Sequence, residues 1–301
     1  MRFPHHRIAP AWFDALLNAE GLTYRIAHRR AHLCPCQDAR ASGPDPQCPR
    51  CGGVGYTWED VPYVRYEEEV RVPAAREEAE GRMSGPTGRV SRAWGRLLEV
   101  EGPLGPVTGA RLEEDYLVLP PGSPAPAVYR VTYEAPLQGR GHAQSVRMSR
   151  KWAERGEVQV GDLVLTVPRK GPDGDNPAWD ALPHDQIVLL DHAHRVEQRM
   201  VRGVKEVLTH PWVREVLRAR ALVAGQEALY LPGEDFQVVD GRVAWEAGRG
   251  PAPRTPYVLE YVAAPTYYVL EDLGQRRHIE GYDLPRRFYL RLFDAYPGRG
   301  R

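Results

Sequence analysis

Short runs in which hydrophobic and polar residues alternate recur along most of the chain, and clusters of glycine and proline separate them. Alternation with a period of two is typical of half-buried β-strands. Strands that recur this often without helices between them favour a barrel or a sandwich. The sequence therefore predicts a mainly β protein of short-stranded barrel or sandwich units, with strands at 61–66, 70–72, 97–100, 115–119, 129–133, 158–167 and 185–190.

The N-terminal region follows a different period. Residues 10–20 place Trp12, Phe13, Leu16 and Leu17 on one face of a helix, with a proline at its start and a glycine just after its end. We expect an amphipathic helix here that docks on a neighbouring domain or subunit.

Two further segments leave the element type open. Residues 204–223 fit a helix by the spacing of their apolar residues, although their surroundings are strands. Residues 283–293 fit either a strand or a helix, and Pro285 suits the start of both.

A weak internal repeat relates 114–136 to 234–265. Both stretches begin with Glu-Asp-aromatic-x-Val, continue with Pro-Ala-Pro and Tyr-x3-Tyr, and end on Ala-Pro. The second stretch adds a hairpin signal at Asp240-Gly241. The repeat predicts two related β units, with chance similarity between proline-rich strand pairs as the alternative.

Length and composition set the number of units. A chain of 301 residues and 33.9 kDa is long enough for two or three domains. Its 29 glycines and 28 prolines indicate many turns, and its 42% of hydrophobic residues suffices for real cores. We expect a helix and a four-cysteine module in 1–60, a β-barrel-like domain in 61–199 and a second β domain in 200–301.

The charge balance disfavours a protein that binds polyanions in bulk, because 40 basic residues match 40 acidic ones. No apolar run reaches the length of about 18 residues expected of a membrane span, and no apolar signal core follows the first residues. We therefore expect a protein that is made and kept in a cytoplasm and has no membrane partner.

All four cysteines fall in one short segment, as the pairs Cys34, Cys36 and Cys48, Cys51. The 18 residues from the first cysteine to the last hold almost no other apolar side chain. Ordering them costs about 1 kcal/mol each even at the low end, whereas a structural zinc ion supplies about 10–16 kcal/mol. Two close pairs on turns suit a tetrahedral, closed zinc site. His28 or His32 remains an alternative ligand in place of one cysteine.

Candidates for catalysis are few. The chain lacks a phosphate-binding P-loop, a G-x-S-x-G elbow and an H-E-x-x-H pair. Asp191, His192 and His194 follow an apolar strand and could form a metal pair, although strand histidines without a ligand are commoner. Asp162 and Asp185 could mimic a carboxylate pair, but both sit where turn residues precede strands. We expect no catalytic residues and no enzyme.

Two stretches resemble structural proteins of tailed bacteriophages. The first is Cys34-Pro-Cys36 with Cys48-Pro-Arg-Cys51-Gly-Gly-Val-Gly, similar to a cysteine module near the start of some virion proteins. The second is 230–269, with Asp240-Gly-Arg-Val-Ala-Trp, similar to β-hairpin units of head-to-tail joint and tail proteins. The stretch 160–188 also resembles the small barrel of head-closure proteins.

The resemblance implies a non-enzymatic component of the virion, assembled in the host cytoplasm and placed in the neck, the connector or the tail. Its implied partners are copies of itself in a ring and other virion proteins, such as portal, head-completion or tail proteins, with passive contact to DNA. The competing hypothesis is a cytoplasmic zinc-ribbon module that binds nucleic acid or protein. A third hypothesis, an enzyme that uses 191–194, has no supporting motif.

Overall fold

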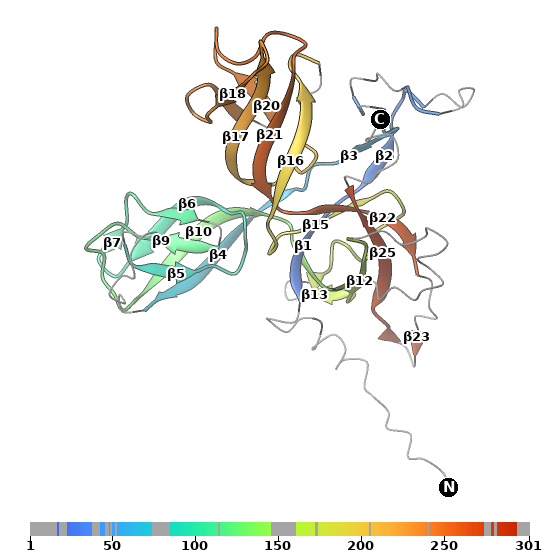
Figure 1. The fold of residues 1–301 in the computed structure, drawn as a ribbon. Coiled ribbons are helices and arrows are strands. Elements are labelled where there is room, and N and C mark those ends of the chain that lie inside the picture. Colours follow the sequence, from blue (N-terminus) through green and yellow to red (C-terminus); the bar gives the residue numbers. More distant parts are fainter. Residues whose placement is uncertain are drawn as a thin grey trace. The chain divides into compact units, whose positions relative to one another are not determined.

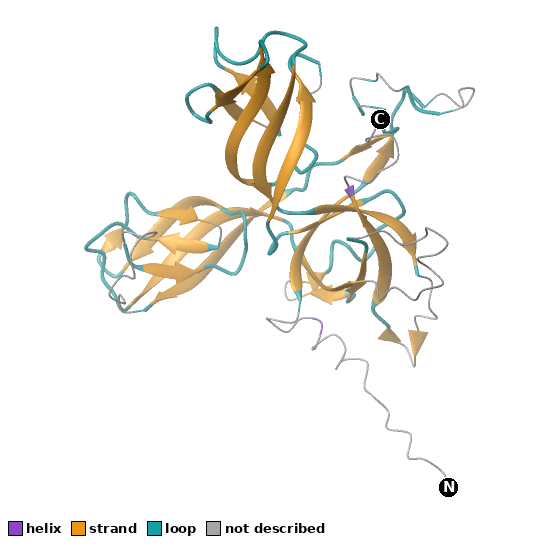
Figure 2. Ribbon diagram, viewed as in Figure 1, coloured by secondary structure: helices purple, strands orange, loops and turns teal. Residues whose placement is uncertain are grey.

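A computed structural model of the protein describes residues 17, 23–37, 43–45, 48, 50–51, 53–73, 85–113, 115–145, 161–171, 174–204, 206–239, 241–273, 278–279 and 282–293. The elements of this part are β-strands, in agreement with the predicted mainly β class (Figures 1 and 2). Of the helix predicted over 10–20, only Leu17 is described, and it is buried. The remainder of that helix lies outside the described residues.

A closed barrel of six strands forms the centre of one compact unit, which comprises 1–59 and 139–301. Each strand pairs antiparallel with its two neighbours, so that the barrel has no free edge. Ile26, Leu165, Ile187 and Phe288 fill its interior and are fully buried. The order around the barrel is β1 (Tyr24–Arg29), β11 (Gly139–Ser145), β12 (Leu163–Val167), β25 (Arg286–Leu292), β22 (Thr266–Asp272) and β15 (Gln186–Leu189).

This grouping differs from the expected boundaries at 61–199 and 200–301. The barrel takes β1 from the first expected region and β22 and β25 from the last. The second compact unit, 60–138, lies between two barrel strands along the chain. Alternation marks each strand separately and carries no signal for pairing between distant strands, which explains the difference.

The unit 60–138 is a two-layered β structure. Its larger sheet has the order β4 (Tyr63–Val72), β10 (Ala127–Pro136), β6 (Arg96–Gly102) and β7 (Gly105–Pro106). The smaller sheet has the order β5 (Thr87–Arg89), β9 (Tyr116–Val118) and β8 (Arg111–Glu113). The charged residues Glu67, Glu69 and Arg71 lie in β4, where exposed side chains alternate with more buried ones.

The second β unit, residues 194–263, has the same arrangement. Its sheet has the order β16 (His194–Val201), β21 (Pro256–Ala263), β17 (Val213–Val223) and β18 (Gln226–Tyr230). The hairpin of β19 (Phe236–Val239) and β20 (Arg242–Trp245) contributes Phe236 and Val243 to the core of this unit. In both sheets the last strand along the chain lies between the first strand and a strand that continues into a short hairpin.

The two segments of ambiguous type each contain a strand. Residues 204–223 include β17, and residues 283–293 include β25 of the barrel.

A tyrosine in the first unit fixes the correspondence in detail. Tyr133 Oη donates a hydrogen bond to Glu68 Oε1 at 2.7 Å, and the backbone N–H of Ser91 donates to the same oxygen at 2.8 Å. Glu68 stands opposite Val131, two residues before the tyrosine, in the pairing of β4 with β10. Glu68 Oε1 thus links β10 of the larger sheet to the segment at Ser91, which follows β5.

The second unit repeats this contact at the matching positions. Tyr261 Oη donates to Gln198 Oε1 at 2.9 Å, and the backbone N–H of Thr209 donates to the same oxygen at 2.8 Å. Gln198 stands opposite Leu259, again two residues before the tyrosine. Shared strand order and a shared hydrogen-bonded junction make 60–138 and 194–263 two versions of one β unit.

The remaining strands form short hairpins. They are β2 (Ala31–Leu33) with β3 (Tyr56–Trp58), β13 (Lys170–Gly171) with β14 (Gly174–Asp175), and β23 (His278–Ile279) with β24 (Tyr282–Asp283). A search of the described residues for a helix with the length and apolar character of a membrane span finds none.

Candidate metal centre

The four cysteines lie in the connection of the β2–β3 hairpin. Leu33 pairs with Tyr56, and the backbone N–H of Cys34 donates to Gly55 O at 2.9 Å, which extends the ladder by one step beyond the strands. The first cysteine pair directly follows β2 and the second pair precedes β3, so the hairpin places both pairs at the same end.

The four sulfur atoms gather in one cluster, all within 4.8 Å of one another. Cys34 Sγ lies 3.7 Å from Cys48 Sγ, and Cys36 Sγ lies 3.4 Å from Cys51 Sγ. A tetrahedral ion with sulfur bonds of about 2.3 Å would hold its ligands about 3.8 Å apart. No disulfide joins these four cysteines. The predicted set can therefore bind a metal ion such as zinc.

Tight turns aim the sulfurs inward. Cys34 O accepts a hydrogen bond from the N–H of Gln37 at 2.9 Å, and Cys51 O accepts one from the N–H of Val54 at 3.3 Å. Gly55 has a φ of 86°, and a Cβ at this position would lie 2.5 Å from Gln37 Nε2. The glycine is needed both for its left-handed backbone and for the close approach of the two turns.

The thiols strongly perturb one another. Burial and the hydrogen bonds that the Cys36 thiol donates to neighbouring sulfurs raise its pKa to about 12. The backbone N–H of Cys51 lowers the pKa of Cys48 to about 7 in spite of burial. Four clustered sulfurs, three of them in buried residues, cannot all ionise side by side unless a positive charge is present, and a divalent cation at their centre would supply it.

The two histidines considered as alternative ligands lie outside the cluster. His28 Nε2 is 2.8 Å from Asp185 Oδ2 and is nearly buried, whereas His32 Nε2 is 2.6 Å from Glu59 Oε1 at the surface. Among the described residues, the four cysteines form the one group with the geometry of metal ligands.

Aromatic residues anchor the hairpin on the barrel. Trp58 Nε1 donates to His184 O at 2.9 Å, and the ring of Tyr56 stacks on that of His184 with centroids 4.3 Å apart. Trp58 also meets Phe293, just after β25, edge to face at 5.0 Å. Sequence analysis missed this anchor, although the two aromatic residues at alternate positions of β3 were a signal for it.

The segment 191–194 does not form the metal pair weighed from the sequence. Asp191 accepts hydrogen bonds at 2.6 Å from both the backbone N–H and the Nε of Arg25. His192 is exposed, and His194 packs its ring edge to face on His210 at 4.7 Å. The contact of Asp191 with Arg25 ties the chain after β15 to β1, so this segment has a structural role.

The two other carboxylates weighed as a pair serve separate parts of the fold. Asp162 is buried and binds Arg291 Nη2 at 3.0 Å and Tyr289 Oη at 2.5 Å. Burial and this carboxylate raise the pKa of Tyr289 to about 12. Asp185 instead accepts hydrogen bonds at the junction of the barrel with the cysteine hairpin, from Ala31 N at 2.7 Å and Leu182 N at 2.9 Å.

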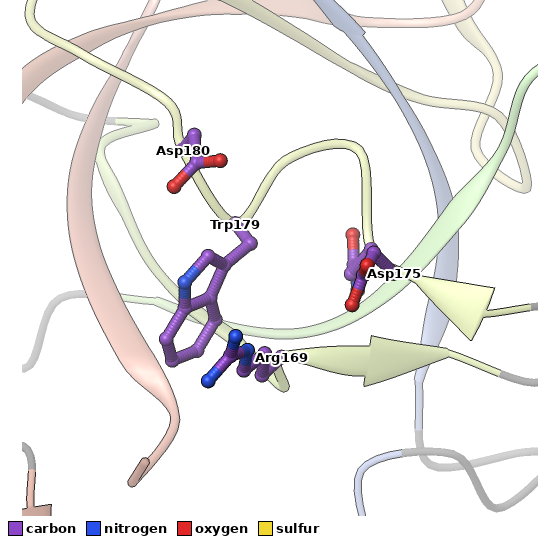
Figure 3. Close-up of a pocket in the computed structure, with 5 residues that line it drawn as sticks. Arg169, Asp175, Trp179 and Asp180 are labelled. Carbon is purple, nitrogen blue, oxygen red and sulfur yellow. The ribbon is translucent and has the colours of Figure 1, made fainter.

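A pocket beside the β13–β14 hairpin was not anticipated from the sequence (Figure 3). Its lining combines both signs of charge with one aromatic ring, and Asp175 is paired with Lys170 at 2.6 Å. Asn176, also in the lining, is bound to Arg140 O. These contacts assign no chemistry to the pocket, which is lined by Arg169, Asp175, Asn176, Trp179 and Asp180.

Comparison with protein-family models and with curated proteins gives no match to this chain. Its function is therefore argued from its geometry and from the resemblance of its motifs.

Proposed function

We propose that the protein is a non-enzymatic structural component of a tailed phage particle at the head-to-tail joint, where it assembles as a ring and contacts portal, head-completion or tail proteins. The observation that carries the proposal is that one chain holds two versions of a β unit and a closed barrel. Two versions of one module give a chain two related surfaces, and repeated surfaces suit assembly from many identical subunits. The phage-like motifs lie in one copy of the unit and in the cysteine hairpin.

The cysteine cluster belongs to this proposal as a structural zinc site with one ion per chain. Four thiolates complete a tetrahedral shell and leave no position for a reacting water. The ion would hold together the connection between β2 and β3, which has almost no apolar side chains of its own. Trp58 and Tyr56 of β3 in turn anchor this hairpin through their contacts with His184.

The contacts of the candidate catalytic groups support a structural role over an enzymatic one. Asp162, Asp185 and Asp191 are each held by an arginine, a histidine or backbone N–H groups that fix strands or junctions. A general acid or base must instead reach a substrate.

Labelling of particles tests the proposal. Gold-labelled antibody against this chain, applied to phage particles made from the genome that carries its gene, should mark the neck or the tail. Particles without label, together with tight and salt-dependent binding of free DNA or RNA by the purified monomer, would support the zinc-ribbon alternative.

A further inference from the structure

Each of the two β units leaves one face of its four-stranded sheet open. In 60–138 the side chains of Val70, Tyr129 and Val131 face the smaller sheet, and the alternate residues point away from it. In 194–263 Met200, Leu259 and the other core residues face the β19–β20 hairpin in the same way. The outward side chains of these two faces carry most of the charge of each sheet.

The open face of 60–138 has an acidic centre, here called the acidic face. Its middle rows run across β4, β10 and β6 and expose the side chains of Glu67, Glu69, Glu99 and Glu101 around Arg130. Arg130 lies 3.6 Å from Glu67 and 3.5 Å from Glu101, so it cannot neutralise all four carboxylates.

The open face of 194–263 has a basic centre, here called the basic face. Arg195, Arg218 and Arg220 converge on Glu260, whose side chain is fully buried beneath them. The Nε atoms of Arg218 and Arg220 lie 3.1 and 3.0 Å from its carboxylate. Arg199 is exposed beside this cluster and, among the described residues, forms no ion pair. One buried carboxylate thus gathers three arginines, and two exposed carboxylates, Glu197 and Glu227, lie 3.1 and 3.7 Å from Arg220 on the same face.

Strand pairing aligns the two faces residue by residue. Glu99 and Glu101 stand opposite Thr132 and Arg130, and Arg218 and Arg220 stand opposite the matching residues of β21. At four matched positions the charge is reversed between the units, whereas Glu67 matches Glu197, which carries the same charge. These four positions are Glu69 with Arg199, Glu99 with Arg218, Glu101 with Arg220, and Arg96 with Glu215.

From this reversal we infer that the acidic face of one copy of the protein docks on the basic face of a second copy. The charge reversal at these four positions makes the centres of the two faces complementary in potential. The contact is heterologous, because it joins two different surfaces, the acidic face of one copy and the basic face of the next. Repetition of such a contact closes a ring or extends a fibre. The inference deepens the proposed ring assembly and rests on it for its biological setting.

Charge reversal in the full-length protein tests the docking. Glu69→Arg with Glu99→Arg disables the acidic face, and Arg199→Glu disables the basic face. By sedimentation velocity at low salt the parent protein should self-associate, and each variant should do so at least about tenfold more weakly, equivalent to about 1.4 kcal/mol. Salt should weaken the parent association as well. Glu113→Arg, on the smaller sheet of 60–138, is the matched control and should behave like the parent.

Mixing the two variants gives the sharper result. The acidic-face variant keeps a basic face, and the basic-face variant keeps an acidic one, so the mixture should associate more strongly than either variant alone. A parent that stays monomeric at low salt, or variants that associate as strongly as the parent, would overturn the inference. Thermal melting checks the fold, and Glu69→Gln and Arg199→Gln replace any variant that melts early.

The failures of the two proposals are distinguishable. Particles labelled at the neck by the antibody, combined with unchanged association of the variants, would reject the docking and keep the proposed function. Association that depends on both faces in a protein absent from particles would reject the virion and keep the docking.

Discussion

Gln198 holds in the second β unit the position that Glu68 holds in the first, and each accepts a tyrosine hydroxyl and a backbone N–H on one oxygen. The shared contact itself uses one oxygen, which a carboxylate or an amide can supply, but Gln198 Nε2 also donates a hydrogen bond to Val207 O at 2.8 Å. We expect Glu68→Gln to change the free energy of unfolding by less than about 1 kcal/mol, and Glu68→Ala to cost about 1–3 kcal/mol.

Urea unfolding of the full chain, followed by tryptophan fluorescence, measures both changes. At the matching position, Gln198→Glu should cost more than Glu68→Gln, because it also removes the hydrogen bond from Nε2 to Val207 O and sets two oxygens against each other. Equal losses for Gln and Ala at residue 68 would mean that the shared contact does not stabilise the unit.

Metal content tests the cysteine cluster. Purified protein should contain about one zinc ion per chain by elemental analysis, and Cys48→Ser should lose most of it, because three thiolates leave the tetrahedral shell incomplete. His32→Gln, a nearby change at an exposed side chain outside the cluster, should retain the ion. Full zinc content in Cys48→Ser would show that the ion binds elsewhere.

A glycine substitution separates the turn from the ligands. Gly55→Ala places a methyl group 2.5 Å from Gln37 Nε2 and forces a left-handed backbone on alanine. We expect faster loss of zinc to a chelator, while all four sulfurs remain. Gly43→Ala, where no atom lies within 4 Å of the added Cβ, should release zinc at the parent rate.

The junction at Asp185 should make stability depend on pH. Burial alone would raise the pKa of this carboxyl, but hydrogen bonds from His28 and from the N–H groups of Ala31 and Leu182 outweigh it and hold the pKa below the ordinary 3.8. The stabilisation is present above the pKa of the unfolded chain and is lost as the pH falls through the lower folded value.

Melting temperature measured from pH 6 to pH 3 should therefore fall less steeply below about pH 4 in Asp185→Asn than in the parent. The variant should also be less stable at neutral pH by about 1–3 kcal/mol, since it removes a charge-assisted acceptor. Identical pH profiles would exclude this carboxyl as a source of acid sensitivity.

Two neighbouring residues test the structural reading of 191–194. Asp191→Asn should lower the melting temperature, because Arg25 loses its carboxylate partner. His192→Gln removes an exposed ring that contacts the ring of Tyr24, at 4.5 Å between centroids, so it should lower stability less than Asp191→Asn and leave particle assembly unchanged. Lost infectivity in normally assembled His192→Gln particles would revive a catalytic hypothesis for this segment.

The features that local sequence could predict were those encoded within a few residues. The cysteine pairs and their glycines gave the cluster, and alternation gave most strands. The repeat could be detected in the sequence because Tyr133 and Tyr261 make the same contact in the two units, which requires the same residue at both positions. The barrel was not predictable in its extent, because the pairing of β1 with β15 joins residues far apart whose alternation looks like that of any strand. The buried carboxylate of Glu260 was missed for a similar reason, since its three arginines come from neighbouring strands.

The closure of the barrel by β25 has a consequence during synthesis. β25 pairs with both β12 and β22, so neither of these strands has its second partner until residue 292 has left the ribosome. The unit 60–138 is complete long before that point and can fold first. β12 therefore keeps an open edge from residue 167, and β22 from residue 272, until β25 is made, and a product that stops before β25 would present both edges to other chains.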